Sequence, residues 1–381
     1  MVNAPGWLTK LQPPKEEDFR SAAHHERVTA RIGLWLGIAF TVCFLTGLLS
    51  HFIQKPPTWF YWPARPVNLF RITQGLHVIA GVAAIPLLLA KLWSVYPKLF
   101  GRPLVRSLPH ALERASILVL SGAAFFELAT GLFNVAQNYL WGFHFPAAHY
   151  AMAWVAIGSI FVHVAVKLPV IRRGLQRLNG EPEASSDGVL SRRGFLRSTA
   201  LATGVAVVAT AGATVPLLRD VSPLSWRSSR GPQGVPVNRT ALAARVTEDA
   251  LDPAWRLEVV TPGGTRTFSL AELSAMPQTT ASLPISCVEG WSQSASWTGV
   301  RVADLLGDWA GSDVRVESLE QRGGYRKSTL PGTHTGDPLT LLTLRLNGEP
   351  LALDHGFPCR VIAPSRPGVL QTKWVARLEV L

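Results

Sequence analysis

The chain has 381 residues, of which 16% are charged and 48% are hydrophobic. Soluble globular domains carry about 25% charged residues, so this composition excludes a disordered chain and disfavours an ordinary cytosolic enzyme. The net charge is +12, but the basic residues lie beside apolar segments, which indicates membrane topology and no nucleic-acid partner. The three cysteines, Cys43, Cys287 and Cys359, have unrelated spacings, which excludes a disulfide framework and a zinc site.

Five apolar segments lie between residues 30 and 218. Each is long enough to cross about 30 Å of hydrocarbon as a helix. None has a polar face, so we expect membrane-spanning helices rather than the buried helices of a soluble bundle. The predicted segments are residues 32–51, 70–93, 115–135, 147–171 and 199–218.

The basic residues concentrate on one side of the predicted membrane. Lys and Arg are frequent at residues 10–31, 91–114 and 167–197. The few on the other side are Lys55, Arg65 and Arg71. Because cytoplasmic loops carry an excess of Lys and Arg, we expect a multi-pass protein of the cell membrane, in contact with lipid. Its N-terminus should be cytoplasmic and, after five crossings, its C-terminal part extracytoplasmic.

The composition changes after the fifth segment. Residues 221–381 contain turn signals and short alternating runs such as Leu341–Leu346, which predict a strand-rich α+β domain with a few short helices. The expected parts of this multidomain chain are a cytoplasmic segment (1–30), an all-α four-helix membrane domain (31–175), a cytoplasmic linker with a fifth, anchoring helix (176–220) and an extracytoplasmic domain (221–381).

The stretch from Ser191 to Arg197, which contains Arg192-Arg193, precedes the fifth segment. It resembles the twin-arginine export signal, which serves domains that are translocated already folded. The resemblance implies the twin-arginine translocation machinery as a partner; a plain basic flank is the alternative. We expect the fifth helix to remain as an anchor, although Ala211-Gly212-Ala213 resembles a cleavage site.

Histidines inside the predicted spans are candidate haem ligands. His149 and His163 are separated by close to four helical turns, which places both on one helix face about 21 Å apart. This spacing suits axial ligands of two stacked haems. His77 and His149 both lie near the outer ends of their segments, so we predict that they bind one haem. A partner for His163 is expected near residues 33–37, which contain no histidine; a hydrogen bond to a neighbouring helix is the alternative role for each histidine.

This membrane part resembles the four-helix cytochrome b subunits of formate dehydrogenases and nickel–iron hydrogenases. The matching residues are Leu45-Thr46-Gly47, Arg71, His77 to Gly81 and the pair His149 and His163. The resemblance implies two haems b and a membrane quinone as electron partner. Because the first segment lacks the histidine of the family, we expect one haem, and a second haem with His163 as ligand is left open.

Cys287 lies in the sequence Cys287-Val288-Glu289-Gly290-Trp291-Ser292. A thiolate is a good ligand for a soft metal centre, whereas a buried structural cysteine is the alternative. With the following Trp297-Thr298-Gly299, this stretch resembles the sulfite oxidase-like molybdopterin domain, which occurs in sulfite oxidase, plant nitrate reductase and the periplasmic methionine sulfoxide reductase catalytic subunit. Further matches are Gly324-Tyr325, Leu346 to Leu351, His355 to Arg360, Gly368 and Lys373-Trp374.

The resemblance implies that Cys287 ligates the molybdenum of a molybdopterin without a nucleotide. A pterin phosphate needs cations, and Arg360 and Lys373, with Arg366 behind them, are the predicted ones. The other predicted site residues are Trp374 and Asn238 for cofactor binding, and Arg239 and Tyr325 for catalysis. Surface charges and a core tyrosine are the alternatives. We expect Cys359 to serve packing, and His334 and His355 to lie in solvent or turns.

These patterns predict a membrane-anchored molybdenum oxidoreductase that is fused to its own cytochrome b. It would link oxygen-atom transfer on a small-molecule substrate to haem b and quinone. Reduction of an S- or N-oxide is favoured because the methionine sulfoxide reductase system also works with a membrane haem subunit. Sulfite oxidation is the alternative reaction, and a non-catalytic membrane electron-transfer or sensory protein is the alternative of another class. The substrate, the direction and the oligomeric state do not follow from the sequence.

Overall fold

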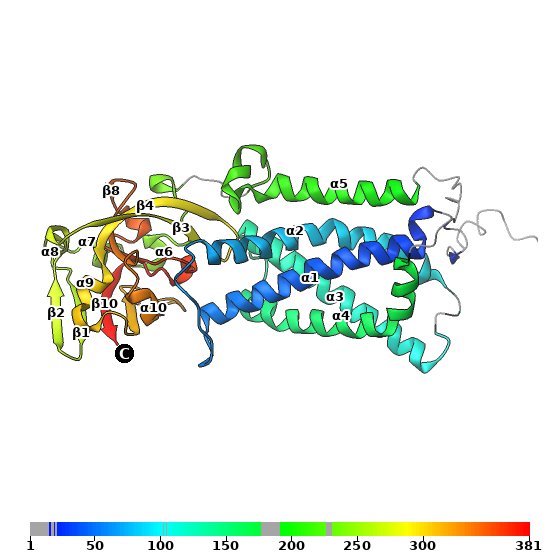
Figure 1. The fold of residues 1–381 in the computed structure, drawn as a ribbon, viewed down its shortest axis with the longest axis horizontal. Coiled ribbons are helices and arrows are strands. Elements are labelled where there is room, and N and C mark those ends of the chain that lie inside the picture. Colours follow the sequence, from blue (N-terminus) through cyan, green and yellow to red (C-terminus); the bar gives the residue numbers. More distant parts are fainter. Residues whose placement is uncertain are drawn as a thin grey trace, which may run out of the picture. The chain divides into compact units, whose positions relative to one another are not determined.

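The computed structural model describes residues 15–16, 19, 21–101, 103, 105–176, 191–225 and 231–381. Five long helices, labelled in Figure 1, occupy the positions of the predicted apolar segments. They are α1 (Glu26–Gln54), α2 (Leu69–Val95), α3 (Leu108–Ala136), α4 (Phe145–Leu175) and α5 (Arg192–Thr210). The first four extend beyond the apolar runs at one or both ends, because polar residues at a helix end remain in contact with water or headgroups.

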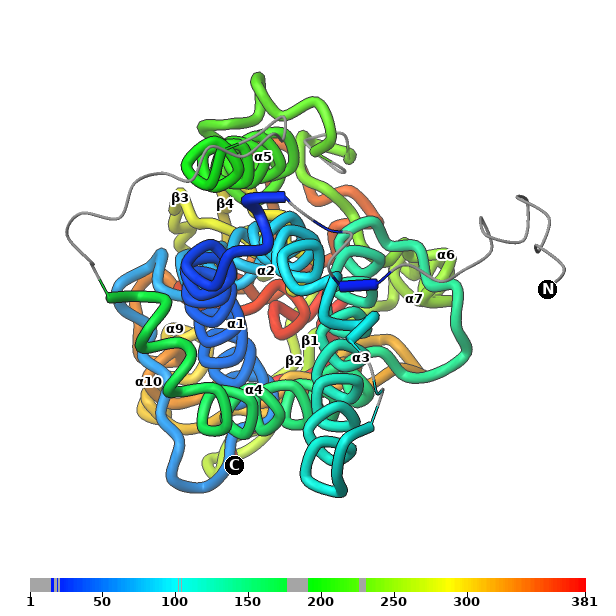
Figure 2. Tube along the Cα trace, turned by 90° about the vertical axis from the view of Figure 1, so that its right-hand side faces the viewer, coloured from blue at the N-terminus to red at the C-terminus, as the bar shows by residue number. Residues whose placement is uncertain are grey.

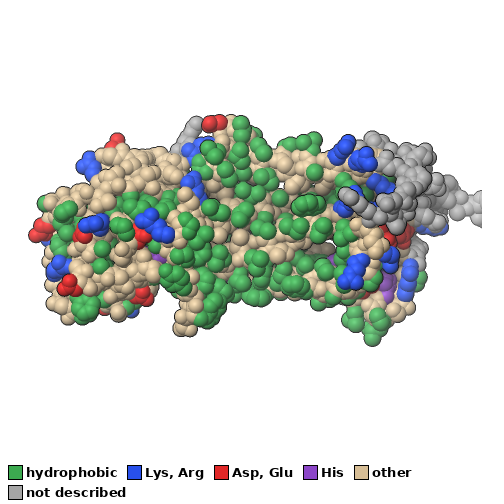
Figure 3. Space-filling model, viewed as in Figure 1, with side chains coloured by type: hydrophobic (Ala, Val, Ile, Leu, Met, Phe, Trp, Pro, Cys, Tyr) green, Lys and Arg blue, Asp and Glu red, His purple; other side chains and the backbone are tan. Residues whose placement is uncertain are grey.

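All five helices are long and apolar enough to cross a membrane. Large apolar side chains on them are exposed, among them Trp35, Leu118, Phe161 and Leu201. Figure 3 shows hydrophobic side chains across the visible face of these helices. An apolar surface of this extent is unfavourable in water and is typical of a membrane or partner contact. The helices are therefore compatible with a membrane protein, as expected.

The helices pack on one another through small and aliphatic side chains. A cluster with members from α1 to α4 contains Phe40, Leu88, Ala124 and Ile160. A second cluster joins α1, α2 and α5 through Ile32, Leu87 and Phe195. Figure 2, which looks along the helices, shows α5 beside α1 and α2. Haem binding by these helices stays a prediction.

The fifth helix differs from its predicted bounds of 199–218. It begins at Arg192, so Arg192 and Arg193 form its first turn. It is followed by a 3₁₀ turn at Ala211–Ala213 and a second at Pro216–Val221, because Pro216 cannot continue an α-helix. The small residues that resemble a cleavage site are buried.

Some predictions concern residues outside the described ranges. They include the linker over residues 177–190 and four of the basic residues that support the predicted orientation. These four are Lys10, Arg20, Arg102 and Arg177.

The C-terminal part folds into two five-stranded sheets with short helices, as predicted. One sheet has the order β2-β1-β10-β5-β6; the other has β3-β4-β7-β8, with β9 also paired to β7. The strands are β1 (Leu257–Thr261), β2 (Gly264–Phe268), β3 (Thr279–Ser286), β4 (Ser292–Arg301), β5 (Val314–Ser318), β6 (Lys327–Leu330), β7 (Leu341–Leu346), β8 (Glu349–Pro350), β9 (Arg360–Ile362) and β10 (Val375–Val380). The short α-helices are α6 (Ala241–Ala244), α7 (Thr247–Leu251), α8 (Leu270–Ala275), α9 (Val302–Leu306) and α10 (Gly332–Thr335).

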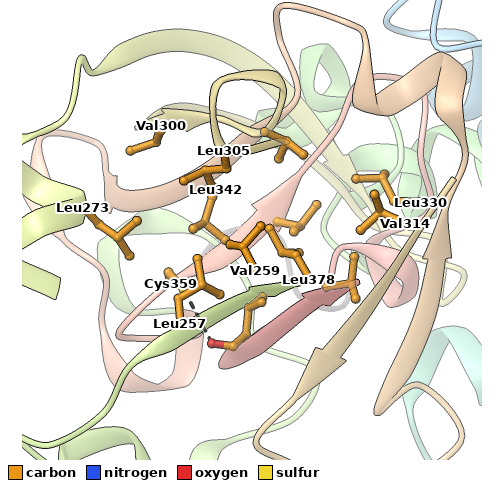
Figure 4. Packing of buried hydrophobic residues seen from close by; sticks show 14 of the residues in the cluster. Leu257, Val259, Leu273, Val300, Leu305, Val314, Leu330, Leu342, Cys359 and Leu378 are labelled. Carbon is orange, nitrogen blue, oxygen red and sulfur yellow. Dashed lines mark hydrogen bonds between the residues drawn. The ribbon is translucent and has the colours of Figure 1, made fainter. Parts of the chain in front are cut away.

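Alternating apolar side chains of these strands form a common core, shown in Figure 4 with Val259, Leu342 and Leu378. Cys359 lies in the same cluster, fully buried, and its Sγ lies 3.6 Å from the carbonyl oxygen of Val375. Burial raises the pKa of the Cys359 thiol, which keeps it neutral and unreactive. This environment agrees with a packing role for Cys359.

The chain separates into two compact units. One contains residues up to 45 and residues 79–209; the other contains residues 46–78 and 210–381. The ends of α1 and α2 and their connection, residues 46–78, thus belong to the unit of the two sheets. We call residues 46–78 the inter-helix segment. Within this unit, Arg65 forms a bidentate ion pair with Asp337, at 2.8 and 3.0 Å, and the indole of Trp62 donates a hydrogen bond to the carbonyl of Ser365 at 2.7 Å.

Candidate functional site

A cavity lies where loops from both sheets meet, and its empty space measures about 680 Å³, including the part that opens to solvent. Seven of the eight predicted site residues of this domain line it: Asn238, Arg239, Cys287, Tyr325, Arg360, Lys373 and Trp374. Residues separated by more than a hundred positions therefore meet in one place. The structure brings together most of the residues that the sequence predicts for this site.

Cys287 directly follows strand β3 and is completely buried. Its backbone N–H donates to the carbonyl of Trp291 at 2.9 Å, and its carbonyl accepts from Gly290 at 3.1 Å. Gly290 has a φ of 92°, which favours glycine at this turn. The amide nitrogen of Asn238 lies 4.0 Å from Cys287 Sγ. The turn thus holds a single thiol at the wall of the cavity, with polar groups nearby.

The guanidinium of Arg360 is buried at the cavity wall. Its two terminal nitrogens donate to the carbonyls of His355 and Gln371, each at 3.1 Å. Its Nε is buried and has no hydrogen-bond partner among the described residues. A buried, unpaired donor is costly unless a ligand satisfies it. Arg360 is therefore suited to an anion in this cavity.

Lys373 supplies a second buried cation. Its ammonium donates to the carbonyl oxygens of Arg239 and Asp354, the latter at 3.0 Å, and lies 4.4 Å from the ring centre of Trp374. Burial and, after it, the charge of Arg360 lower the pKa of Lys373 to about 7. Burial also lowers the pKa of Arg360 to about 9. An anion in the cavity would raise both pKa values, because it favours the charged forms.

We expect anion binding in the cavity to weaken above pH 7. The Lys373 ammonium loses its proton in the empty cavity as the pH rises through about 7, whereas a bound phosphate keeps it charged. Binding then takes up one proton, so the affinity should fall by up to about tenfold per pH unit above that pKa. Calorimetric titration of the cofactor-free protein with sulfate, a similar oxyanion that does not itself titrate near pH 7, measures this slope at several pH values.

The substitution Lys373→Met should lower the affinity below pH 7 and remove most of the slope. Lys327→Met is a matched control, because Lys327 is about half exposed and pairs with Glu317 on a strand surface. An affinity of the unmodified protein that does not change with pH would contradict the role of Lys373.

Two of the predicted catalytic residues lie near the mouth of the cavity. Arg239 forms an ion pair with Glu320, with 3.4 Å between Nη1 and Oε2. Burial raises the pKa of Glu320, and Arg239 and Lys373 oppose this rise. Tyr325 is partly exposed, and its hydroxyl donates to Gln54 Oε1 at 2.8 Å. Burial and the nearby Cys287 raise the pKa of Tyr325, so its phenol stays a neutral donor.

One predicted cofactor ligand lies elsewhere. Arg366 is buried, but its guanidinium donates to the carbonyls of Leu370, at 2.9 Å, and Thr329, at 2.6 Å, and it is not among the residues that line the cavity. These bonds connect the loop of Arg366 to its own next turn and to strand β6. The expectation that Arg366 stands behind the phosphate cations stays a prediction.

His334 and His355, which were expected in solvent or in turns, lie in short helical turns, and both are buried rather than in contact with solvent. His355 lines the cavity and donates from Nε2 to the carbonyl of Pro232 at 2.7 Å. Burial, with a contribution from Arg360, lowers the pKa of His355 to about 4, so it is neutral. Sequence reasoning also missed Glu320 and Gln371, and nothing in their local sequence marks them as cavity residues.

In the helices, two candidate haem ligands share a local pattern. The hydroxyl of Thr46 lies 3.2 Å from His77 Nδ1, and that of Thr130 lies 3.1 Å from His149 Nδ1. The Thr130 hydroxyl donates to the carbonyl of Phe126 at 2.7 Å, so its oxygen accepts from Nδ1–H of His149. Such a bond fixes a histidine tautomer with the lone pair on Nε2, which is the form that binds metals.

The surroundings of Nε2 in His149 contain an acidic partner. Glu127 Oε2 lies 3.2 Å from this nitrogen, a contact that requires a proton on one of the two atoms. Iron at Nε2 would take the place of that contact. For His163, Lys91 approaches one end of the predicted partner region on α1, at Gly33. Its ammonium donates to the carbonyl of Thr29 at 2.9 Å and lies 3.0 Å from the position of a Cβ on Gly33. The number of haems stays a prediction.

Comparison with known proteins finds one family model and several partial relatives. The family described as "Oxidoreductase molybdopterin binding domain" matches residues 243–381. The mitochondrial sulfite oxidase of Rattus norvegicus is 31% identical over 163 residues, which cover 34% of this chain and 30% of that protein. The NAD(P)H nitrate reductase of Hordeum vulgare is 41% identical over 96 residues, which cover 22% of this chain and 11% of that protein.

A third relative is the "Putative protein-methionine-sulfoxide reductase subunit YedZ1" of Azospira oryzae. It is 32% identical over 114 residues, which cover 30% of this chain and 43% of that protein. The matches thus span less than half the length of each of these relatives. Residues 243–381 thus match an oxidoreductase molybdopterin-binding domain, and the chain is similar in part to sulfite oxidases, which supports an oxidoreductase enzyme.

Proposed function

We propose that this protein is a membrane-bound molybdenum oxidoreductase that couples oxygen-atom transfer on a small-molecule substrate to haem b and the quinone pool. The observation that carries the proposal is the cavity. Its lining includes the thiol of Cys287, Arg360 with its unpaired Nε, and the buried ammonium of Lys373. A single soft donor beside two buried cations suits a molybdenum centre whose pterin ends in a phosphate.

The donor set of the cavity fits molybdopterin. Cys287 would ligate the metal through its thiolate, while Arg360 and Lys373 would hold the pterin phosphate. When bound, the group supplies two-electron chemistry with transfer of an oxygen atom. The chain supplies the rest: Tyr325 and Arg239 present a hydroxyl and a positive charge at the mouth, where a substrate enters. Trp291, which is buried and lines the cavity, excludes water from the wall beside Cys287.

The haem proposal concerns the histidines of the helices. His77 and His149 would be the axial ligands of one haem b, each oriented by a threonine hydroxyl at Nδ1. A second haem at His163 is left open, since Lys91 approaches one end of the region where a partner on α1 was expected. Haem b would pass electrons singly to or from membrane quinone.

We also propose the orientation and the export route. An N-terminus in the cytoplasm and a C-terminal domain outside it follow from the distribution of Lys and Arg. The twin-arginine machinery would translocate the domain after cofactor insertion. The buried 3₁₀ turn at Ala211–Ala213 supports retention of α5, because a protease does not reach an enclosed peptide.

Reduction of an S- or N-oxide is the favoured reaction. One relative carries a name that refers to protein-methionine-sulfoxide reductase. Sulfite oxidation is the second candidate, because several relatives are sulfite oxidases. A non-catalytic electron-transfer or sensory protein is less well supported, since the cavity keeps both the thiol and the cations.

The test is an assay of purified membranes. We expect quinol-dependent reduction of at least one compound in a panel of sulfoxides and N-oxides, together with molybdenum in the purified protein. Sulfite-dependent reduction of haem without any oxide reduction would select the second candidate. A purified protein without molybdenum would contradict both enzyme proposals.

A further inference from the structure

The turn that carries Cys287 is held by groups from outside the turn as well as within it. Two of its carbonyls, those of Cys287 and Trp291, accept hydrogen bonds from N–H groups of the turn itself. The carbonyl of Val288 accepts from the side-chain amide of Gln74 at 3.3 Å. The carbonyl of Gly290 accepts from the hydroxyl of Thr214.

Gln74 and Thr214 come from the ends of two predicted membrane helices. Gln74 lies in the first turns of α2, in the inter-helix segment, and Thr214 follows the 3₁₀ turn after α5. The two lie close together in space. A Cβ added to Gly75, the residue after Gln74, would be 3.5 Å from the methyl group of Thr214. Both side chains are at least nine-tenths buried, so water does not readily replace either bond.

A hydrogen bond is hardest for water to replace when its donor is buried. Loss of the Gln74 or the Thr214 donor would leave the carbonyl of Val288 or Gly290 without that buried partner. Cys287 lies one residue from Val288 and three from Gly290, so a shift of either peptide moves the thiol. Groups that hold the backbone of a metal ligand set the direction of the ligand bond and tune the metal.

We propose that Gln74 and Thr214 are positioning residues for Cys287. Through the carbonyls of Val288 and Gly290, they hold the turn in the form that aims the thiol into the cavity. The membrane helices then shape the metal site directly as well as anchoring the domain. This inference rests on the proposed function only in taking Cys287 as the molybdenum ligand.

The first test uses the cofactor-free protein in detergent and needs neither metal nor turnover. Alkylation of Cys287 by iodoacetamide, followed by mass spectrometry of its peptide, reports how often the turn opens. Gln74→Leu and Thr214→Val should each raise the alkylation rate by about 3- to 10-fold, which corresponds to the loss of one hydrogen bond. Thr214→Ser keeps the hydroxyl and should restore the low rate.

Two controls separate positioning from general stability. Ser294→Ala removes the hydrogen bond that Arg71 donates to Ser294 at 3.0 Å, which also joins α2 to the sheets but does not touch the Cys287 turn. It should leave the alkylation rate unchanged. Cys359, buried in the core, is the internal reference for unfolding. If its labelling rises together with that of Cys287 in both variants, the bonds serve overall stability and the proposal fails.

The second test uses the molybdenum-loaded protein. The paramagnetic resonance spectrum of the half-reduced metal is sensitive to the direction of the metal–sulfur bond. Gln74→Leu and Thr214→Val should shift this spectrum at unchanged molybdenum content, whereas Ser294→Ala should not. Unchanged spectra and unchanged alkylation in both variants would overturn the proposal. An unchanged spectrum in Cys287→Ser would show instead that Cys287 is not the metal ligand. That failure of the proposed function is therefore distinguishable from failure of the positioning role.

Discussion

Replacement of Cys287 by Ser is expected to abolish turnover while the domain remains folded. A hydroxyl is a harder and less acidic ligand than a thiol, so it should not replace a thiolate–metal bond. The two side chains have nearly the same volume, which spares the buried site next to β3. The pterin should remain bound, because its phosphate would be held by Arg360 and Lys373. A quinol-coupled activity assay, together with metal and pterin analysis, measures the result.

Cys359→Ser is the matched control, since Cys359 is equally buried but lies in the hydrophobic core (Figure 4). It should keep activity at a cost on the order of 1 kcal/mol in the free energy of unfolding. Activity that survives in Cys287→Ser and is lost in Cys359→Ser would show that the ligand assignment is wrong. The correspondence of this domain with the sulfite oxidase-like family would then need to be redrawn.

His77→Ala and His149→Ala are each expected to remove the same haem b, for which the two histidines are the predicted axial ligands. A haem with two axial histidines loses its low-spin state when one ligand is missing. The measurement is the reduced haem absorbance of membranes that contain equal amounts of each variant. His144→Ala is the control, because His144 is exposed and directly precedes α4, the helix of His149.

Unchanged spectra in both His77→Ala and His149→Ala would rule out this ligand pair. His163→Ala should affect only a second haem. A stoichiometry of one haem per chain in the unmodified protein, with no effect of His163→Ala, would make His163 a structural residue. In that case, Lys91 on α2 would simply fill the space beside Gly33.

The helices were predictable from composition because a run of about 20 apolar residues has few stable alternatives. Their ends were less predictable, since they depend on single residues. Pro216 ends the α-helical continuation of the fifth segment, and the first turn takes in Arg192. The thiol of Cys287 could also be predicted from sequence, because it lies in a recognisable short motif, Cys287 to Ser292.

Partners within the site were not predictable, because they depend on contacts between distant residues. Gln54 and Tyr325 are 271 residues apart in the chain, yet share a hydrogen bond. The sequence cannot rank Arg360 above Arg366 either, since both are arginines within six positions. Only the course of the backbone turns Arg360 to the cavity and Arg366 to the carbonyls of Leu370 and Thr329.

By itself the sequence thus determined the two classes of structure, the apolar helices and the strand-rich domain, and the thiol that marks the cavity. Those features depend on local composition and on short motifs. The tertiary structure decided which cations face that thiol and that the inter-helix segment belongs with the two sheets. It also decided that Gln74 and Thr214 hold the Cys287 turn. Long-range packing makes those choices, because burial and hydrogen bonding there depend on residues far apart in the chain.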